Sequence, residues 1–318
     1  MTRRAALFVA TLAALSLAAP WLAPYDAGLG FRDFLHAPPM RPLFQGFSAP
    51  VVHPLVLADR LEQRFEADQS RTLPLPWFGG ATDQPVFLLG ADNFGRDVLS
   101  RLLYGARTSV GLALFATIGA VVIGAFAGAW AGLRGGWIDD AVMRVADFVL
   151  ILPVIYVVLV LRAVLPLVLP ASTVFLLVAC IFVAVGWPFV AKGVRAIVVA
   201  ERDREYVQAA RSLGAGPGRI LVHHLIPACF GHLVVQATLL LPGFILAEAT
   251  LSFVGLGFPD PIASWGTMLA EAGNYNAVAR FPWTLAPAVA IFAIVLATNL
   301  IASPDRKLSP GRKAGSAA

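Results

Sequence analysis

Two stretches of this chain contain no charged residue over a length that can cross a lipid bilayer. They are residues 5–24 and 108–133. A helix needs about 20 apolar residues to cross a bilayer core about 30 Å thick. Across the whole chain 58% of the residues are hydrophobic and 14% are charged, whereas a soluble domain has about 45–50% and about 25%. These values argue against a soluble domain and predict a membrane protein.

Further apolar stretches are also long enough to span the membrane. Pro166 and Pro170 divide the longest of them into two helices, because a proline interrupts helical hydrogen bonding. We therefore expect an all-α integral membrane protein with about six transmembrane helices. The spans are expected near residues 5–24, 108–133, 148–168, 171–191, 233–256 and 281–303.

Ionisable residues lie inside two of these stretches. Arg162 in the third span costs about 2.5–3.5 kcal/mol, while the apolar residues of that span return about 5–10 kcal/mol, so we expect the span to persist with Arg162 reaching toward the membrane surface. Glu248 lies in the fifth span, where its carboxyl either has a functional role or reaches water or a partner helix. Trp265 and Trp283 are typical of the aromatic belt at a membrane interface.

The distribution of basic residues predicts which side of the membrane each end faces. Arg3 and Arg4 precede the first span and favour a cytoplasmic N-terminus. With six spans, the C-terminus and more than half of the 24 Lys and Arg residues also fall on the cytoplasmic side. A competing interpretation is a cleaved signal peptide, because the small residues Ala18 and Ala19 end the first apolar run. That interpretation removes one helix.

Residues 25–107 have the composition of a water-exposed segment. They contain many prolines and an amphipathic patch in which Leu57, Leu61 and Phe65 recur at i, i+4 and i+8, which predicts a short helix. The expected organisation is an N-terminal transmembrane helix (1–24), an exported segment with an interfacial helix (25–107), a core with five transmembrane helices (108–304) that includes a cytoplasmic loop (201–227), and a cytoplasmic tail (305–318).

The cytoplasmic loop has the pattern of two short helices. Tyr206, Ala210 and Leu213 recur at i, i+4 and i+7 and predict a first helix that ends at Gly214 in a left-handed cap. Pro217 suits the first turn of a second helix. The loop is either a shape that lies in a groove of another protein or an ordinary connector.

The same loop resembles the EAA motif of ABC importer permeases. Gln208, Ala209, Ala210, Gly214 and Pro227 fall at the spacing of that motif. Gln208 stands where the motif has a glutamate, and the ending His-Leu-Ile-Pro also departs from it, but both departures resemble the peptide-type subgroup. The resemblance implies coupling to an ATPase subunit through Glu205, Tyr206, Val207, Gln208, Ala209, Ala210, Arg211, Leu213 and Gly214.

Two further stretches resemble the dipeptide and oligopeptide permeases. Residues 89–109 resemble the segment Gly-Thr-Asp-x-x-Gly-Arg-Asp, and they predict a turn at residues 93–95 followed by an amphipathic helix along the outer interface, with Val98 on its apolar side and Arg101 on its charged side. Residues 248–266 resemble Leu-Ser-Phe-Leu-Gly-Leu-Gly followed by Ser-Trp-Gly. The external-face motif residues are Asp92, Gly95, Arg96, Asp97, Gly255, Gly257, Ser264, Trp265 and Gly266.

The resemblance implies the permease subunit of an ATP-driven ABC importer for peptides or related small solutes, located in the inner membrane. Its implied partners are a homologous second permease, two ATP-binding subunits that hold ATP and Mg, an external solute-binding protein and membrane lipid, with no nucleic acid. The alternative is an autonomous secondary transporter or channel with Glu248 and Arg162 on its ion path.

No residue pattern indicates an enzyme. His223, His224 and His232 lack the cysteines or carboxylates that complete a metal site. The glycines of residues 214–218 are not followed by Gly-Lys-Ser or Gly-Lys-Thr, so they do not form a phosphate-binding loop. An intramembrane enzyme is disfavoured because no nucleophile and base stand out in the spans. We expect no catalytic, cofactor-binding or metal-binding residues, and two free cysteines.

Overall fold

The computed structural model describes most of the chain. The described residues are 7, 11, 14, 17–44, 50–60, 62–75, 84–153, 156–160, 170–273 and 275–302. Much of the first expected span, together with Leu61, Arg162 and the tail 305–318, lies outside them. In the third expected span, residues 154–155 and 161–169 also lie outside them.

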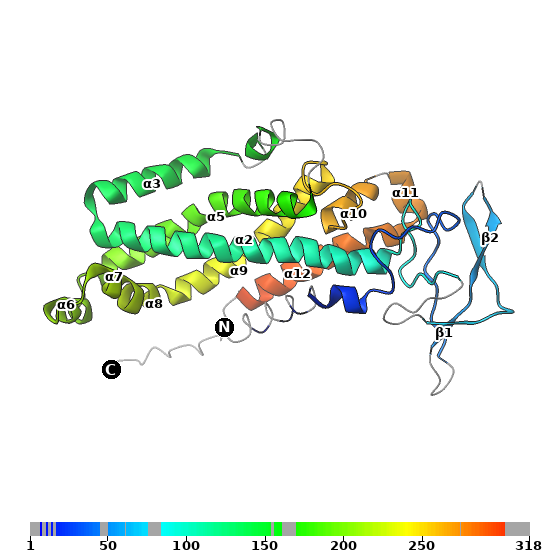
Figure 1. The fold of residues 1–318 in the computed structure, drawn as a ribbon, viewed down its shortest axis with the longest axis horizontal. Coiled ribbons are helices and arrows are strands. Elements are labelled where there is room, and N and C mark those ends of the chain that lie inside the picture. The colour runs from blue at the N-terminus through cyan, green and yellow to red at the C-terminus, as the bar shows by residue number, and fades with distance from the viewer. Residues whose placement is uncertain are drawn as a thin grey trace, which may run out of the picture.

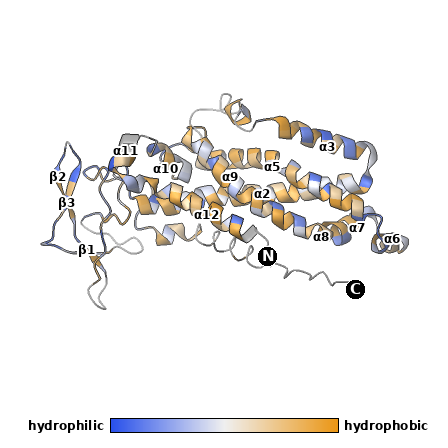
Figure 2. Cartoon of the chain, turned by 180° about the vertical axis from the view of Figure 1, so that it is seen from behind, coloured by the Kyte–Doolittle hydropathy of each residue, from blue (hydrophilic) through white to orange (hydrophobic). Residues whose placement is uncertain are grey.

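Long apolar helices dominate the described residues. Four stretches among them are long and apolar enough to cross a membrane, and they match the second, fourth, fifth and sixth expected spans. They lie side by side in an elongated bundle (Figure 1), and hydrophobic residues dominate them (Figure 2). The expected all-α membrane fold is therefore confirmed. The four stretches are α2 (Val98–Arg134), α5 (Ala171–Glu201), α9 (Phe230–Phe253) and Pro282–Leu300, which joins η2 (Pro282–Leu285) to α12 (Ala286–Ala302).

Glycines allow α2 and α5 to pack closely. Gly124 and Gly128 are separated by about one turn and lie on the same face of α2. A Cβ atom at Gly128 would lie 2.2 Å from the carbonyl oxygen of Ala191 on α5, and one at Gly124 would lie 2.6 Å from that of Trp187. Small residues at this spacing bring two helix backbones into contact, as in many membrane helix pairs.

A further helix, α3 (Gly136–Ile151), returns along the bundle beside α5 (Figure 1). Asp139 accepts two hydrogen bonds from the guanidinium of Arg195 on α5, each 2.5 Å long. The helix begins well before residue 148, where the third span was expected, because Gly135 breaks the chain after α2 with a φ of 63°.

The segment that precedes α2 forms a small β structure beyond one end of the bundle (Figure 1). It contains two antiparallel pairs, in which β1 pairs with β4 and β2 pairs with β3. Phe87 and Val52 are buried in the apolar core beneath these strands. The strands are β1 (Val51–Val52), β2 (Leu55–Asp59), β3 (Arg64–Ala67) and β4 (Leu73–Pro74).

The short helix expected over residues 57–65 is wrong. Leu57 and Phe65 pair across the β2–β3 hairpin, which turns at Gln63 with a φ of 51°. The ring of Phe65 stacks on that of Phe34 with 6.0 Å between the ring centroids. An apolar pair separated by eight residues fits one face of a helix and also the two strands of a hairpin, so the spacing did not distinguish them.

The helix expected after the turn at residues 93–95 is present, but it is continuous with the second span. Helix α2 runs without a break from Val98, and Asp97 caps its N-terminus by accepting a 2.8 Å hydrogen bond from the backbone N–H of Ser100. Helix α5 likewise continues to Glu201, past its expected end at residue 191. Helices α2 and α5 are therefore longer than the apolar stretches that the sequence identifies.

Candidate functional site

Short helices project from the end of the bundle opposite to the strands (Figure 1). They follow α5 and together cover the stretch that resembles the EAA motif. Their apolar side packs on the ends of α2 and α5. The elements are α6 (Glu205–Ser212), α7 (Pro217–Ile220), the π-helix η1 (Leu221–Leu225) and α8 (Ile226–Ala228).

The turn after α6 has the geometry that the sequence predicts. Gly214 has a φ of 83°, which confirms the left-handed cap. Its N–H donates to the carbonyl of Arg211 at 2.9 Å, and the N–H of Ala215 donates to that of Ala210 at 3.0 Å. These two bonds form a Schellman motif. Pro217 is the first residue of α7, which is also confirmed.

Helix α6 leaves most of its surface open. Among the residues expected to contact an ATPase, all of which the structure describes, Val207 alone is buried, and it packs in a cluster with Ile220 and Leu225. The Leu213 side chain is 89% exposed, and Tyr206, also exposed, donates its hydroxyl hydrogen to Glu201 Oε2 at 2.9 Å. Val207 therefore anchors a helix that presents an apolar and polar face to solvent.

At the other end of the bundle, a tight turn precedes α2. Gly95 has a φ of 71°, and a Cβ atom there would lie 2.1 Å from the carbonyl oxygen of Phe31. The Asp92 carboxylate accepts hydrogen bonds from the backbone N–H groups of Phe94 and Arg96, at 2.8 and 2.9 Å. The turn expected at residues 93–95 is confirmed, and glycine is required in it.

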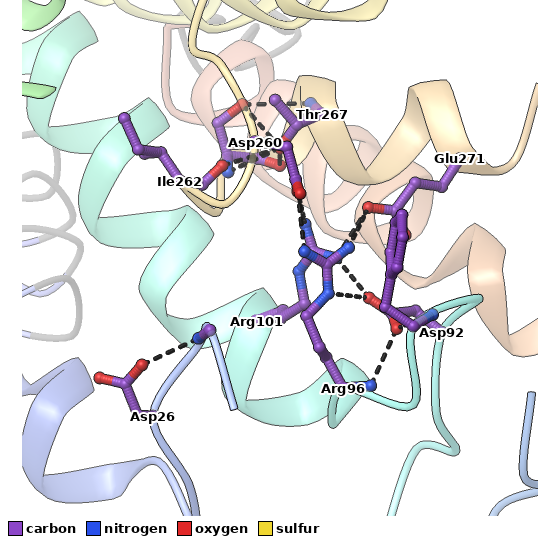
Figure 3. Close-up of polar contacts among 11 residues, drawn as sticks. Asp26, Asp92, Arg96, Arg101, Asp260, Ile262, Thr267 and Glu271 are labelled. Atoms are coloured by element: carbon purple, nitrogen blue, oxygen red, sulfur yellow. Dashed lines mark hydrogen bonds and ion pairs between the residues drawn. The ribbon is translucent and has the colours of Figure 1, made fainter. Parts of the chain in front are cut away.

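Five charged side chains meet beside this turn (Figure 3). Arg96 donates to Asp92 Oδ2 and Asp260 Oδ1 at 2.7 Å each, and to Glu271 Oε1 at 2.8 Å. Arg101 donates to the same Glu271 oxygen at 2.7 Å and also to Asp92 Oδ2. The cluster joins the turn before α2 to a segment more than 150 residues later in the chain.

The burial of this charge cluster differs from what the sequence indicated. Arg101 was expected on the charged side of a helix at the outer interface, yet its side chain is 0% exposed and that of Arg96 is 4% exposed. Neither Asp260 nor Glu271 was among the expected site residues. Asp260 lies inside residues 248–266, the stretch that resembles the family, and Glu271 lies just after it. Only the charge of these two side chains could have marked them as site residues.

Burial also changes the acidity of two carboxyls here. It raises the pKa of Asp97 to about 6, although hydrogen bonds from Ser100 oppose the rise. It raises the pKa of Glu271 to about 7, an effect strengthened by Asp92 and opposed by Arg101. Burial thus opposes ionisation of the Glu271 carboxyl, and the two arginines that donate to it favour ionisation.

The second external motif packs directly on α2. Ser264 caps α10 (Trp265–Glu271), and the buried Trp265 side chain donates from Nε1 to the carbonyl of Leu102 at 3.0 Å. A Cβ atom at Gly105 would lie 2.9 Å from the Trp265 ring. Trp265 is therefore held between helices, and its expected place in the lipid-facing aromatic belt is wrong.

The glycines of this motif are sites of close approach or unusual conformation. A Cβ atom at Gly257 would lie 2.2 Å from Ser252 Oγ, and one at Gly266 would lie 2.5 Å from the carbonyl oxygen of Ala249. Gly255 has a φ of 79°. The structure therefore brings the two external motifs together on the same end of α2, although they lie far apart in the sequence.

Comparison with known proteins assigns the chain to a family. Residues 120–303 match the family model of the binding-protein-dependent transport system inner membrane component. The chain belongs to this family. The matched range includes α5, the α6–α8 loop, α9 and the second external motif, and the expected membership in the binding-protein-dependent permeases is confirmed.

Individual relatives of this permease are transport proteins too. A di/tripeptide transport system permease protein of Pseudomonas aeruginosa is 33% identical over 296 residues, which cover 93% of this chain and 82% of the relative. An oligopeptide transport system permease protein of Bacillus subtilis is 37% identical over 196 residues, 62% of each chain. A methionine ABC transporter structure is 19% identical with a TM-score of 0.48, covering 64% of this chain and 95% of that chain.

Among the described residues, no three His, Cys, Asp or Glu side chains lie together as a metal site would require. Cys180 and Cys229 are both free, as expected. As a membrane component of a binding-protein-dependent ABC importer, the chain contributes membrane-crossing helices, an exposed loop and a largely buried charge cluster.

Proposed function

We propose that this permease forms the membrane path of a peptide importer. The observation that carries the proposal is the match of residues 120–303 to a binding-protein-dependent inner membrane component, combined with relatives named as di/tripeptide and oligopeptide permeases. In the assembly, the chain pairs with a homologous second permease. An external solute-binding protein delivers the peptide.

Helix α6 is the part that couples this path to ATP hydrolysis. It is anchored through the buried Val207 and exposes Leu213, so it can enter a groove without losing its own packing. Two separate subunits bind ATP and Mg and hydrolyse the nucleotide. Their closure pushes on α6, and the connected α5 and α9 transmit the movement to the spans.

The end of the bundle that carries α6 faces the cytoplasm of a cell with an inner membrane. The strands and the charge cluster then lie outside, both termini lie inside, and residues 25–107 are exported. The positive-inside rule supports this orientation, because six basic residues lie in the last turns of α5 and in the loop that follows it. They are Lys192, Arg195, Arg202, Arg204, Arg211 and Arg219.

Site-specific labelling tests the orientation. Gln69 and Gly216 are both exposed and lie at opposite ends of the bundle. In a variant without Cys180 and Cys229, a cysteine at Gln69 should react with a membrane-impermeant maleimide added to spheroplasts. A cysteine at Gly216 should react only after the membrane is permeabilised. Labelling of both from the same side would contradict the arrangement.

Reconstitution tests the function itself. The chain purified with its native partners should take up labelled alanyl-alanine into proteoliposomes only when ATP and the binding protein are both present. Omitting either should reduce uptake to the level of empty vesicles. Uptake by this chain alone, driven by an ion gradient without ATP, would support the autonomous secondary transporter or channel instead.

A further inference from the structure

The joint between α5 and α6 is only three residues long. Helix α5 ends at Glu201 and α6 begins at Glu205. A movement of α6 has to cross this joint to reach the long helix α5. A flexible joint would let α6 swing without moving α5, whereas a rigid joint would make α5 follow α6. The contacts across the joint decide between these two cases.

A single apolar anchor does not fix the direction of α6. The structure describes α6 throughout, and Val207 is its one buried residue, in a cluster that also contains Val194 and Val198 of α5. One anchored side chain leaves a short helix free to turn about it. Tyr206 and Gln208 lie about 100° to either side of Val207 around the helix. These two side chains are therefore placed to limit that rotation from both sides.

Tyr206 reaches back across the joint to α5. Its hydroxyl donates to Glu201 Oε2 at 2.9 Å, and its ring meets the ring of His224 edge to face with 6.1 Å between the centroids. The other carboxylate oxygen of Glu201 lies 3.9 Å from Arg204 Nε. The last residue of α5 thus interacts both with the residue before α6 and with the first turn of α6.

Gln208 spans the joint on the other side of Val207. Its Nε2 donates to the backbone carbonyl of Asp203 at 3.0 Å. This bond requires a donor at the end of the side chain, which glutamine has and an ionised glutamate lacks. The chain therefore carries a donor at the position where the EAA motif has a glutamate, and the chain itself uses that donor.

The joint is also tied to α2. Arg202, the C-cap of α5, donates from Nη1 to the carbonyl of Gly132 at 2.8 Å. A Cβ atom at Gly132 would lie 3.0 Å from the carbonyl oxygen of Arg195, so the backbones of α2 and α5 are close here as well. Helices α2 and α5 form a closely packed pair at this end, and α6 is fastened to that pair.

We propose that Tyr206 and Gln208 are positioning residues that brace α6 against α5, so that α6 and the α2–α5 pair move as one body. The inference rests on the proposed function of α6 as the coupling element. It gives these two side chains a role within the chain, while the exposed Leu213 remains for the ATPase contact. A push on α6 reaches the spans only if the joint keeps its angle. Loss of a brace should therefore lower the uptake obtained per ATP hydrolysed.

The first test replaces Gln208 with glutamate. Gln208→Glu keeps the shape of the side chain and suits the first half of a helix, but it places an acceptor against the Asp203 carbonyl. The matched control is Asp203→Asn, since that side chain is 73% exposed and its replacement leaves the backbone carbonyl in place. In proteoliposomes with the whole complex, Gln208→Glu should lower alanyl-alanine uptake per ATP hydrolysed about threefold, and the control should keep the parent ratio. The ATPase subunits should co-purify with both variants.

A double-mutant cycle tests the Tyr206 brace. Tyr206→Phe removes the hydroxyl and keeps the ring beside His224, while Glu201→Met removes the acceptor. Each change should lower the ratio of uptake to hydrolysis about threefold, and the double variant should lower it no further, because both changes remove the same bond. Glu201→Gln keeps an acceptor oxygen and should retain the parent ratio.

Each outcome decides the proposal. The parent ratio in Gln208→Glu, or additive losses from Tyr206→Phe and Glu201→Met, would overturn it, because the side chains would then act separately. Loss of the ATPase subunits from Gln208→Glu or Tyr206→Phe would also overturn it, since these side chains would then hold the ATPase.

A parent complex without ATP-dependent uptake would refute the proposed function, and hydrogen exchange of the α6 amides would then decide the inference. Faster exchange in Gln208→Glu and Tyr206→Phe than in Asp203→Asn would support the braces. Equal exchange in all three variants would overturn them.

Discussion

Replacing Arg101 with methionine should destabilise the permease by about 3–5 kcal/mol, because it removes one partner from a buried ion-pair cluster. Asp92 and Glu271 each accept a hydrogen bond from Arg101 and would lose it inside the protein. Methionine has a similar length and is apolar, so the loss comes from the missing charge and donors rather than from a large cavity. Uptake should be lost with the fold of this end.

Thermal denaturation of the purified complex in detergent measures this effect. The matched control is Arg64→Met, since Arg64 forms an exposed ion pair with Glu66, at 66% and 63% side-chain exposure. Exposed pairs contribute little to stability, so the control should keep the parent midpoint. Equal midpoints for Arg101→Met and Arg64→Met would show that the cluster does not stabilise the external end.

The second large effect is expected at the opposite end of the bundle. Leu213→Asp should leave the permease folded, because the leucine side chain is 89% exposed and lies at the end of α6. It should disrupt the ATPase contact, because an unpaired carboxylate would be buried where an apolar side chain packs. We expect at least about a tenfold loss of ATP-driven uptake and weaker co-purification of the ATPase subunits.

Affinity purification of the whole complex and its binding-protein-stimulated ATP hydrolysis measure the coupling. Gly216→Asp is the control, since it adds the same charge in the same loop at a position where a Cβ atom meets nothing within 4 Å. Gly216 is the N-cap of α7, a position that suits aspartate. Normal uptake and hydrolysis in Leu213→Asp would show that α6 is an ordinary connector.

Local features were predictable because their causes are local. The apolar stretches of α2, α5 and α9 are long enough to cross a bilayer, so their length and composition alone predict membrane helices. Gly214 and Pro217 end one short helix and begin the next through their own backbone preferences, independent of distant contacts.

Patterns with two geometric solutions were not predictable. The pair Leu57 and Phe65 suits a helix face or a hairpin, and the tertiary packing of Phe65 on Phe34 decides for the hairpin. A tryptophan such as Trp265 is typical of both a membrane interface and a contact between helices. Because Gly105 has no side chain, the Trp265 ring can pack against α2, and the helix contact is the one that forms.

The sequence by itself determined that this protein is helical and crosses a membrane, and it located the turn that ends α6 and the start of α7, since span length and helix ends are local properties. Only the tertiary structure decided where its charges lie. Arg101 follows a turn and looks like a surface residue, but Asp92 and Glu271, the latter 170 residues away, surround it. A buried charge is stable only with such partners, and pairing between distant segments is a property of the fold.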